Sequence, residues 1–172
     1  LIYDGTLYES VNSDYFNIAP IVSRINLNSP EGLSIGSTLG DLINKVNVKE
    51  ETFSQYRQTH LVLDNIPISS DATLNFSVQA NSHKEVEDGW YLVSVFNSAA
   101  PISGFNYTIN LSGKGYGKAD QVQAAIEKGI KGYKKDEADP ASKDWTVYTN
   151  GTQKIYLNTN GDQVNVWVMK AQ

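Results

Sequence analysis

The segment from Gly32 to Gly36 reads Gly-Leu-Ser-Ile-Gly and places Ser34 in the G-x-S-x-G pattern of a serine nucleophile. Such a serine acts from a tight turn between a buried strand and a helix, with an acid and a histidine later in the chain. Residues 26–31 before it have the composition of a turn, and His60 and His83 are the only histidines. We interpret the segment as a plain loop and expect no enzyme; a serine hydrolase using Ser34 is a distant third function.

Other polar segments resemble parts of ligand sites. Residues 113–117 read Gly-Lys-Gly-Tyr-Gly, but this spacing matches neither the dinucleotide fingerprint nor the Walker loop. Two groups of oxygen donors resemble pieces of a calcium site, namely Asn158, Asn160 and Asp162, and Glu85, Glu87 and Asp88. The first group lacks a closing glutamate, and the second is typical of a solvated acidic loop. We expect no cofactor and no metal.

Four Asn-x-Ser/Thr triplets mark candidate N-glycosylation sites at Asn75, Asn106, Asn110 and Asn150. Each Asn falls on the polar side of an alternating segment or at a turn, where a glycan can be tolerated. An Asn-rich chain also acquires such triplets by chance, and their occupancy depends on a host that glycosylates.

Alternating apolar and polar residues predict the strands that would position these groups. Residues 74–78 and 105–111 alternate over strand-length runs, which indicates half-buried strands. Residues 89–96 are apolar on both faces, which is typical of a central strand covered on each side. We therefore expect Trp90 to be buried.

The last third of the chain predicts a three-stranded meander. Its strand-like segments are separated by Asn150-Gly151 and Asn160-Gly161, and Asn-Gly supplies the positive φ angles of tight hairpin turns. We expect both pairs to be exposed turns and Trp167 to be buried. Residues 131–143, just before the meander, are charged and predict a solvated loop.

Helical signal is limited to two short segments. Asp120 can cap a helix in which Val122, Ala125 and Ile126 share a face. Residues 37–46 form the second candidate, although Gly40 weakens a helix by about 1 kcal/mol relative to Ala. Both helices are expected to lie against a sheet.

Together these patterns predict a single domain over residues 1–172. We expect a mainly β fold, an antiparallel β-sandwich with one or two short peripheral helices and a C-terminal β-meander. The 172 residues are enough to bury a core without a disulfide, and the chain has no cysteine.

Composition restricts the partners and the location. The net charge is −5 and no long lysine or arginine cluster interrupts it, which argues against nucleic acid. No apolar stretch is long enough to span a membrane. The surface polarity comes from Asn, Ser, Thr, Gln and Tyr, so we expect an extracellular or cell-surface protein in a processed form.

Four segments are similar to the pre-peptidase C-terminal domain family of secreted prokaryotic proteins: Gly-Thr-Leu at 5–7, Ser-Asp-Tyr-Phe at 13–16, and residues 89–95 and 104–109. The resemblance covers about half of the chain. It implies a β-sandwich appended to secreted enzymes and surface proteins, with a non-catalytic role in secretion, adhesion or polysaccharide contact.

The first nine residues predict a strand, because Leu1, Tyr3 and Leu7 alternate with more polar neighbours. Such a strand pairs within its own sheet or is donated to a neighbour, and both alternatives stay open. Donation would favour a structural subunit of an extracellular filament, pilus or surface layer that self-associates through a strand edge. The alternative is an adhesive module of a larger secreted protein that binds carbohydrate or protein.

Deletion of residues 1–9 separates the two roles of this strand. If it is donated, the deleted chain stays folded but no longer self-associates, because the bond between subunits is gone. Sedimentation and thermal melting of the shortened chain measure both effects. A monomeric full-length chain whose melting temperature drops sharply on deletion would contradict donation.

Overall fold

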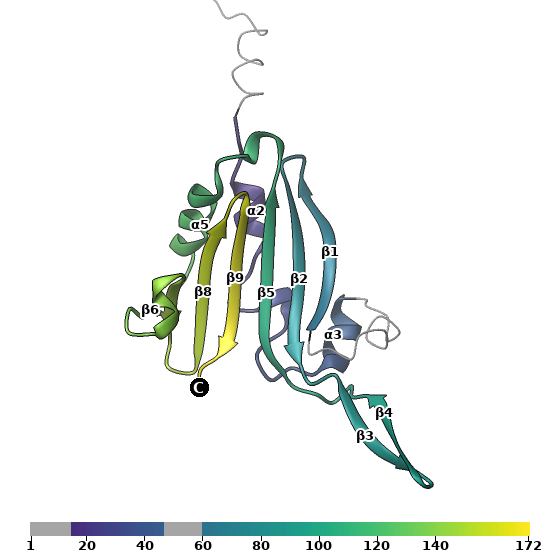
Figure 1. Cartoon of the computed structure of the whole chain (residues 1–172). Coiled ribbons are helices and arrows are strands. Elements are labelled where there is room, and N and C mark those ends of the chain that lie inside the picture. Colours follow the sequence, from purple (N-terminus) through teal and green to yellow (C-terminus); the bar gives the residue numbers. More distant parts are fainter. Residues whose placement is uncertain (1–14, 47–59) are drawn as a thin grey trace, which may run out of the picture.

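The computed structural model describes residues 15–46 and 60–172, and this part of the chain is mainly β (Figure 1). Its strands are β1 (His60–Ser69), β2 (Ala72–Ala80), β3 (His83–Asp88), β4 (Tyr91–Phe96), β5 (Ile102–Leu111), β6 (Lys134–Lys135), β7 (Thr146–Thr149), β8 (Gln153–Asn160) and β9 (Gln163–Lys170). Seven of them form one antiparallel sheet in the order β1-β2-β5-β9-β8-β7-β6, and β3 and β4 form a separate hairpin. The predicted mainly β, antiparallel fold class is confirmed.

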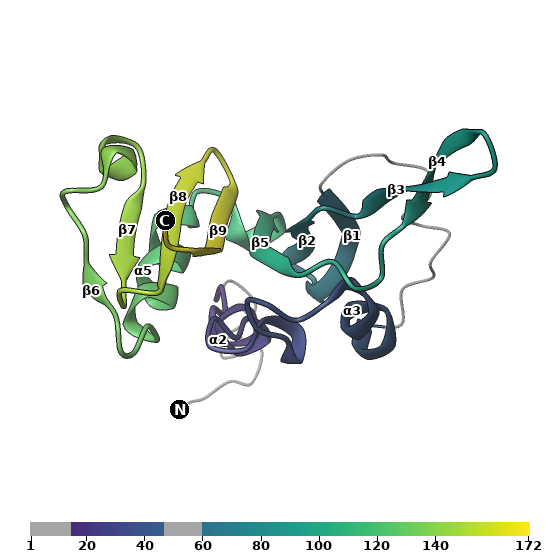
Figure 2. The ribbon, with the colours of Figure 1, turned by 90° about the horizontal axis from the view of Figure 1, so that it is seen from below.

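Short helices and irregular segments form a second layer that packs against one face of the large sheet. The helices are α2 (Ala19–Arg24), α3 (Leu39–Val46) and α5 (Ala119–Lys128), with the 3-10 turns η1 (Pro30–Gly32), η2 (Gly113–Gly115) and η3 (Pro140–Lys143). Figure 2 shows α2 and α3 on one side of the sheet, and α5 contacts α2, β8 and β9. Among the described residues, no helix combines the length and the apolar character needed to cross a membrane.

Strand register lines up the apolar side chains of β2, β5, β9 and β8 on one face of the sheet. The paired rows are Val78, Phe105, Val168 and Ile155; Phe76, Tyr107, Val166 and Leu157; and Leu74, Ile109 and Val164. All of these side chains are buried, and the ring centroids of Phe76 and Tyr107 lie 5.1 Å apart. Because successive side chains point to opposite faces, the residues between them line the other face, which is mostly polar.

The two predicted helices are confirmed and cover the apolar face. Leu39 and Leu42 of α3 and Val122 and Ile126 of α5 are buried in the same core as the strand residues. The prediction that Asp120 caps α5 is wrong. The N-cap position is Lys118, and the Oδ1 atom of Asp120 instead accepts a hydrogen bond from Thr159 Oγ1 at 3.2 Å.

Gly40 has a structural role that its low helix propensity conceals. Its backbone N–H donates to the Ser98 carbonyl oxygen at 2.9 Å, and a Cβ atom at this position would lie 3.3 Å from that oxygen. The first turn of α3 is also capped reciprocally, since the N–H of Asp41 donates to Thr38 Oγ1 and the N–H of Thr38 donates to Asp41 Oδ2. The glycine therefore allows the capped end of α3 to contact the chain that returns from β4.

The C-terminal meander is also confirmed. Strands β7, β8 and β9 pair in sequence, and the turns at Asn150-Gly151 and Asn160-Gly161 are exposed. Both glycines have positive φ angles, 94° at Gly151 and 60° at Gly161, as tight turns require. Trp167 is half-buried on β9.

The prediction of a central strand at residues 89–96 is wrong. Gly89, with a φ of 64°, and Trp90 form a two-residue turn between β3 and β4, and the side chain of Trp90 is 98% exposed. The hairpin projects from the body of the protein (Figure 1). The apolar run on both faces of β4 is therefore not covered by a second layer.

Phe76 is among the largest fully buried side chains of the core. Phe76→Ala removes a fully buried ring that packs against Phe105 and Tyr107, so we expect a loss of about 3–5 kcal/mol in the free energy of unfolding. Thr73→Ala, on the opposite face of the same strand, is the matched control and should change it by less than about 0.5 kcal/mol. Urea unfolding measures both, and a loss below about 1 kcal/mol for Phe76→Ala would contradict the assigned core.

Candidate functional site

The β3–β4 hairpin, residues 83–96, is called the arm, and its tip carries the most exposed apolar surface in the described part of the chain. Trp90, Tyr91 and Leu92 are 98%, 75% and 65% exposed. Tryptophan and tyrosine combine a large apolar area with a polar group and few rotatable bonds, which suits them to interfaces. Three consecutive side chains of this kind are an unusual surface for a soluble monomer.

The arm has little support of its own. It contains two strands and no covering layer, and such a hairpin is marginally stable in water. Its first strand is acidic, since Glu85, Glu87 and Asp88 are exposed beside a single exposed lysine, Lys84. The arm therefore presents an aromatic tip next to a cluster of negative charge.

The base of the arm is closed by one backbone hydrogen bond, and the chain that follows it is attached to α3 by two others. The N–H of Asn97 donates to the Ser82 carbonyl at 2.8 Å, and the N–H groups of Leu39 and Gly40 donate to the carbonyls of Ala100 and Ser98 at 3.0 and 2.9 Å. His83 and Phe96 meet edge to face, with ring centroids 6.4 Å apart. The tip is therefore exposed at the end of a well-anchored support.

A second candidate surface is a groove on the mostly polar face of the large sheet. It has a volume of about 620 Å³ and runs from η3 across β8 and β9 to the edge of β2. Its lining includes Gln79, Pro140, Trp145, Lys154, Tyr156, Trp167, Met169 and Lys170. Volumes of about 300–1,000 Å³ are typical of ligand sites, so the groove has room for a ligand or for a pair of aromatic side chains.

Aromatic residues from three elements meet in the groove. Tyr156 on β8 and Trp167 on β9 are paired across the strands, and Trp145 after η3 meets Tyr156 edge to face at 6.5 Å between ring centroids. The Met169 side chain lies over Gly104 on β5, because a Cβ atom at residue 104 would be only 2.7 Å from the Met169 sulfur. The floor of the groove is thus lined by aromatic rings and by the Met169 side chain.

An ion cluster holds η3 against the sheet and forms one wall of the groove. Lys154 Nζ lies 3.1 Å from Asp136 Oδ2 and 2.5 Å from Asp139 Oδ2, and the Tyr156 hydroxyl donates to the same Asp139 oxygen at 3.2 Å. The hydrogen bond from Lys154 lowers the pKa of Asp139, with further help from the Ala141 N–H. The hydrogen bonds to Asp139 and Asp136 raise the pKa of Lys154.

This cluster corrects the prediction of a solvated loop at residues 131–143. The lysines at 131, 134, 135 and 143 are exposed, but the Asp139 side chain retains only 8% of its exposure. Asp139 also caps η3, because its Oδ1 atom accepts a hydrogen bond from the Ala141 N–H at 2.8 Å. The segment is therefore attached to the sheet through its acidic residues.

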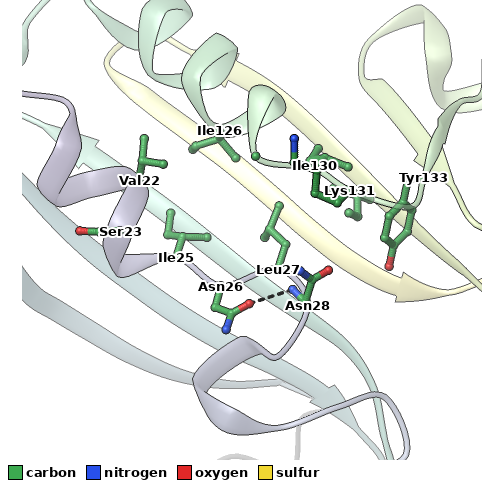
Figure 3. A pocket seen from close by; sticks show the side chains of 12 residues that line it. Val22, Ser23, Ile25, Asn26, Leu27, Asn28, Ile126, Ile130, Lys131 and Tyr133 are labelled. Atoms are coloured by element: carbon green, nitrogen blue, oxygen red, sulfur yellow. Dashed lines mark hydrogen bonds between the residues drawn. The ribbon is translucent and has the colours of Figure 1, made fainter.

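A smaller hollow of about 300 Å³ opens in the helical layer, between α2 with its following loop and the end of α5 (Figure 3). Val22 and Ile25 face Ile126 and Ile130 across it. Among the described residues that line it, Lys131 alone carries a charge. The hollow offers hydrophobic contact, and its described lining contains no carboxylate and no histidine.

The residues of the serine pattern are not brought together in the described structure. Ser34 is exposed, and its hydroxyl lies 3.3 Å from the hydroxyl of Ser37. His83 lies at the base of the arm, where its Nδ1 atom is 2.9 Å from Ser82 Oγ, and the side chain of His60 lies outside the described residues. Within residues 15–46 and 60–172, no three acidic or histidine side chains gather closely enough to hold a metal ion.

The four glycosylation candidates differ in exposure. Asn150 is exposed at a turn, whereas Asn75 and Asn110 are half-buried and Asn106 is buried. The Asn75 side chain accepts a hydrogen bond from the N–H of Asn65 at 3.0 Å, and Asn106 donates to the Val166 carbonyl at 3.4 Å. Asn150 is therefore the most accessible of the four, and glycosylation stays a prediction.

Leu1, Tyr3 and Leu7, the residues of the predicted N-terminal strand, lie outside the described residues. Comparison with protein-family models, curated proteins and solved structures finds no match. The resemblance to the pre-peptidase C-terminal domain family therefore stays a prediction. The arm and the groove are the two surfaces that bear on function.

The ion cluster should make the stability of the folded protein depend on pH. Because the pKa of Asp139 is lower in the folded state, its contribution to stability is present above the unfolded pKa of about 3.9 and is lost as the pH falls through the folded value. Asp139→Asn keeps the cap of η3 but removes the charge. We expect it to lower the melting temperature at pH 7 by roughly 2–4 °C.

The difference in melting temperature between Asp139→Asn and the unchanged protein should shrink as the pH is lowered below about 4. Thermal melting from pH 7 to pH 2 measures it. Asp144→Asn, which removes an exposed carboxylate just after η3, is the matched control. A difference that stays constant down to pH 2 would contradict the role of the charge.

Proposed function

We propose that the protein is a non-catalytic structural subunit of an extracellular filament, pilus or surface layer, and that its arm makes the contact between copies. The observation that carries the proposal is the arm tip, with Trp90 98% exposed at the end of an anchored hairpin. Exposed apolar patches on soluble proteins mark interaction sites, and aromatic side chains dominate the energy of such sites. The extracellular location rests on the composition.

The edges of the large sheet are less suited to the contact. β1 carries Pro67, which has no N–H to donate, and a bulge at Asn65, where φ is 56°. β6 at the other edge consists of only Lys134 and Lys135. Short strands, bulges, prolines and lysines are the devices that prevent pairing of sheet edges, so the arm is the better candidate for assembly.

The charge distribution favours assembly from end to end. The arm, with three exposed acids and one exposed lysine, lies at the opposite end of the molecule from β6 and β7 (Figure 2). In that far region, residues 128–144, the exposed lysines outnumber the exposed acids Glu137 and Asp144, because Asp136 and Asp139 are paired with Lys154. Contacts between two different surfaces of one chain produce open filaments unless the rotation between copies closes a ring.

The alternative is an adhesive module whose arm tip contacts a surface glycan or another protein. Its supporting observation is the same exposed pair, Trp90 and Tyr91, because aromatic faces serve many kinds of partner. The two functions differ in self-association. A chain that stays monomeric at high concentration, yet loses attachment to a surface on Trp90→Ala, would favour the module.

Trp90→Ala tests the proposal directly. We expect it to weaken self-association by more than about tenfold, as truncation of a central aromatic residue does at an interface. The melting temperature should stay the same, because the side chain makes little contact with the body. Sedimentation velocity over a range of concentrations measures the first effect and thermal melting the second.

Tyr116→Ala is the matched control, since Tyr116 is 62% exposed but lies outside the arm. It should leave self-association unchanged. Assembly of Trp90→Ala at the concentrations used by the unchanged chain would refute the role of the arm.

A further inference from the structure

We infer that the groove lined by Trp145, Tyr156 and Trp167 receives the arm tip of a second copy of this chain. The inference rests on the proposed function, because it names the surface that the arm contacts. It follows from two features of one molecule, an aromatic tip without a cover and a separate groove lined by aromatic rings.

The chemistry of the two surfaces matches. The tip offers Trp90, Tyr91 and Leu92, and the groove offers aromatic rings and the polarisable Met169 side chain over Gly104. Aromatic pairs and contacts between sulfur and aromatic rings are favourable beyond simple burial. At about 620 Å³, the groove has room for more than one side chain of the tip.

The charges near the two surfaces are complementary. Glu87 and Asp88 precede the tip, and both are exposed. Lys170 is exposed at the rim of the groove, and the exposed lysines of β6 lie on the segment that leads into η3. Opposite charges at the rim of an interface speed association and fix its orientation.

The geometry favours a second copy over the same copy as the source of the tip. The arm points away from the sheet in both views, and η3, which walls the groove, lies toward the opposite end (Figures 1 and 2). Each copy therefore carries one arm to offer and one groove to fill. Repetition of this contact adds copies at both ends of a growing chain.

A mixing experiment tests the pairing of arm and groove. Trp90→Ala removes the arm contact, and Trp145→Ala removes one wall of the groove. We expect each variant alone to stay monomeric, whereas an equimolar mixture forms 1:1 dimers. The reason is that the intact arm of the Trp145→Ala chain enters the intact groove of the Trp90→Ala chain, and neither partner can extend further.

Lys170→Glu provides a second groove variant, and it takes the place of Trp145→Ala in the mixture if that chain does not fold. Lys170 is exposed, so its replacement leaves the core untouched. We expect the variant to weaken self-association by more than about tenfold, because like charges then face each other across the contact. Lys114→Glu, an equal charge change away from the groove, is the control and should have little effect.

Sedimentation velocity with size-exclusion chromatography distinguishes the outcomes. If Trp90→Ala disperses the assembly but both groove variants assemble normally, the groove is not the receptor and the proposed function stands. If Trp90→Ala assembles normally, or the unchanged chain is monomeric at high concentration, the proposed function and this inference both fail. Monomers in the equimolar mixture would also overturn the pairing.

Discussion

The register between β2, β5, β9 and β8 is the constraint on which the rest of the structure depends. It brings Phe76, Tyr107, Val166 and Leu157 into one row, with equivalent apolar rows on either side. A slip of one residue in any of these strands would turn its apolar side chains to the other face, so the register is strongly specified. With one face fixed as the core, the helices must cover it and the opposite face must carry the polar residues.

The opposite face carries amide and hydroxyl side chains that form hydrogen bonds with one another. Thr108 donates to Asn165 Oδ1 at 3.1 Å, and Asn165 donates to Asn158 Oδ1 at 3.1 Å. Hydrogen bonds also satisfy Asn106, which is buried at the centre of this face: it accepts from the Ser77 hydroxyl at 3.4 Å and donates to the Val166 carbonyl at 3.4 Å. The aromatic residues of the groove depart from this pattern at one end of the face, which is the end that we propose as a contact surface.

Much of this fold is predictable from local sequence, and the unpredicted parts depend on long-range contacts. Alternation identifies β2 and β5. The pairing of Tyr156 with Trp167 does not follow from an Asn160-Gly161 turn, because the two residues between the strands are Gly161 and Asp162, and a turn one residue earlier would place Tyr156 opposite Asn165. The place of Trp145 could not be predicted, since it depends on the bonds from Lys154 to Asp139 and Asp136. The sequence predicts a central strand where the arm lies, because the long apolar run at residues 90–96 outweighs the turn signal of Asp88-Gly89, which is as strong as Asn-Gly.

An aromatic tip that is fully exposed creates a risk of indiscriminate aggregation, and the residues before it reduce that risk. Glu85, Glu87 and Asp88 place negative charge beside Trp90, so two tips that approach each other repel. The same charges favour a basic partner, and specificity gains as much from rejecting wrong contacts as from improving the right one. In the proposed contact the acidic strand and the aromatic tip act together: the tip would supply affinity, and the charges would exclude contact between tips in favour of a surface with exposed lysines.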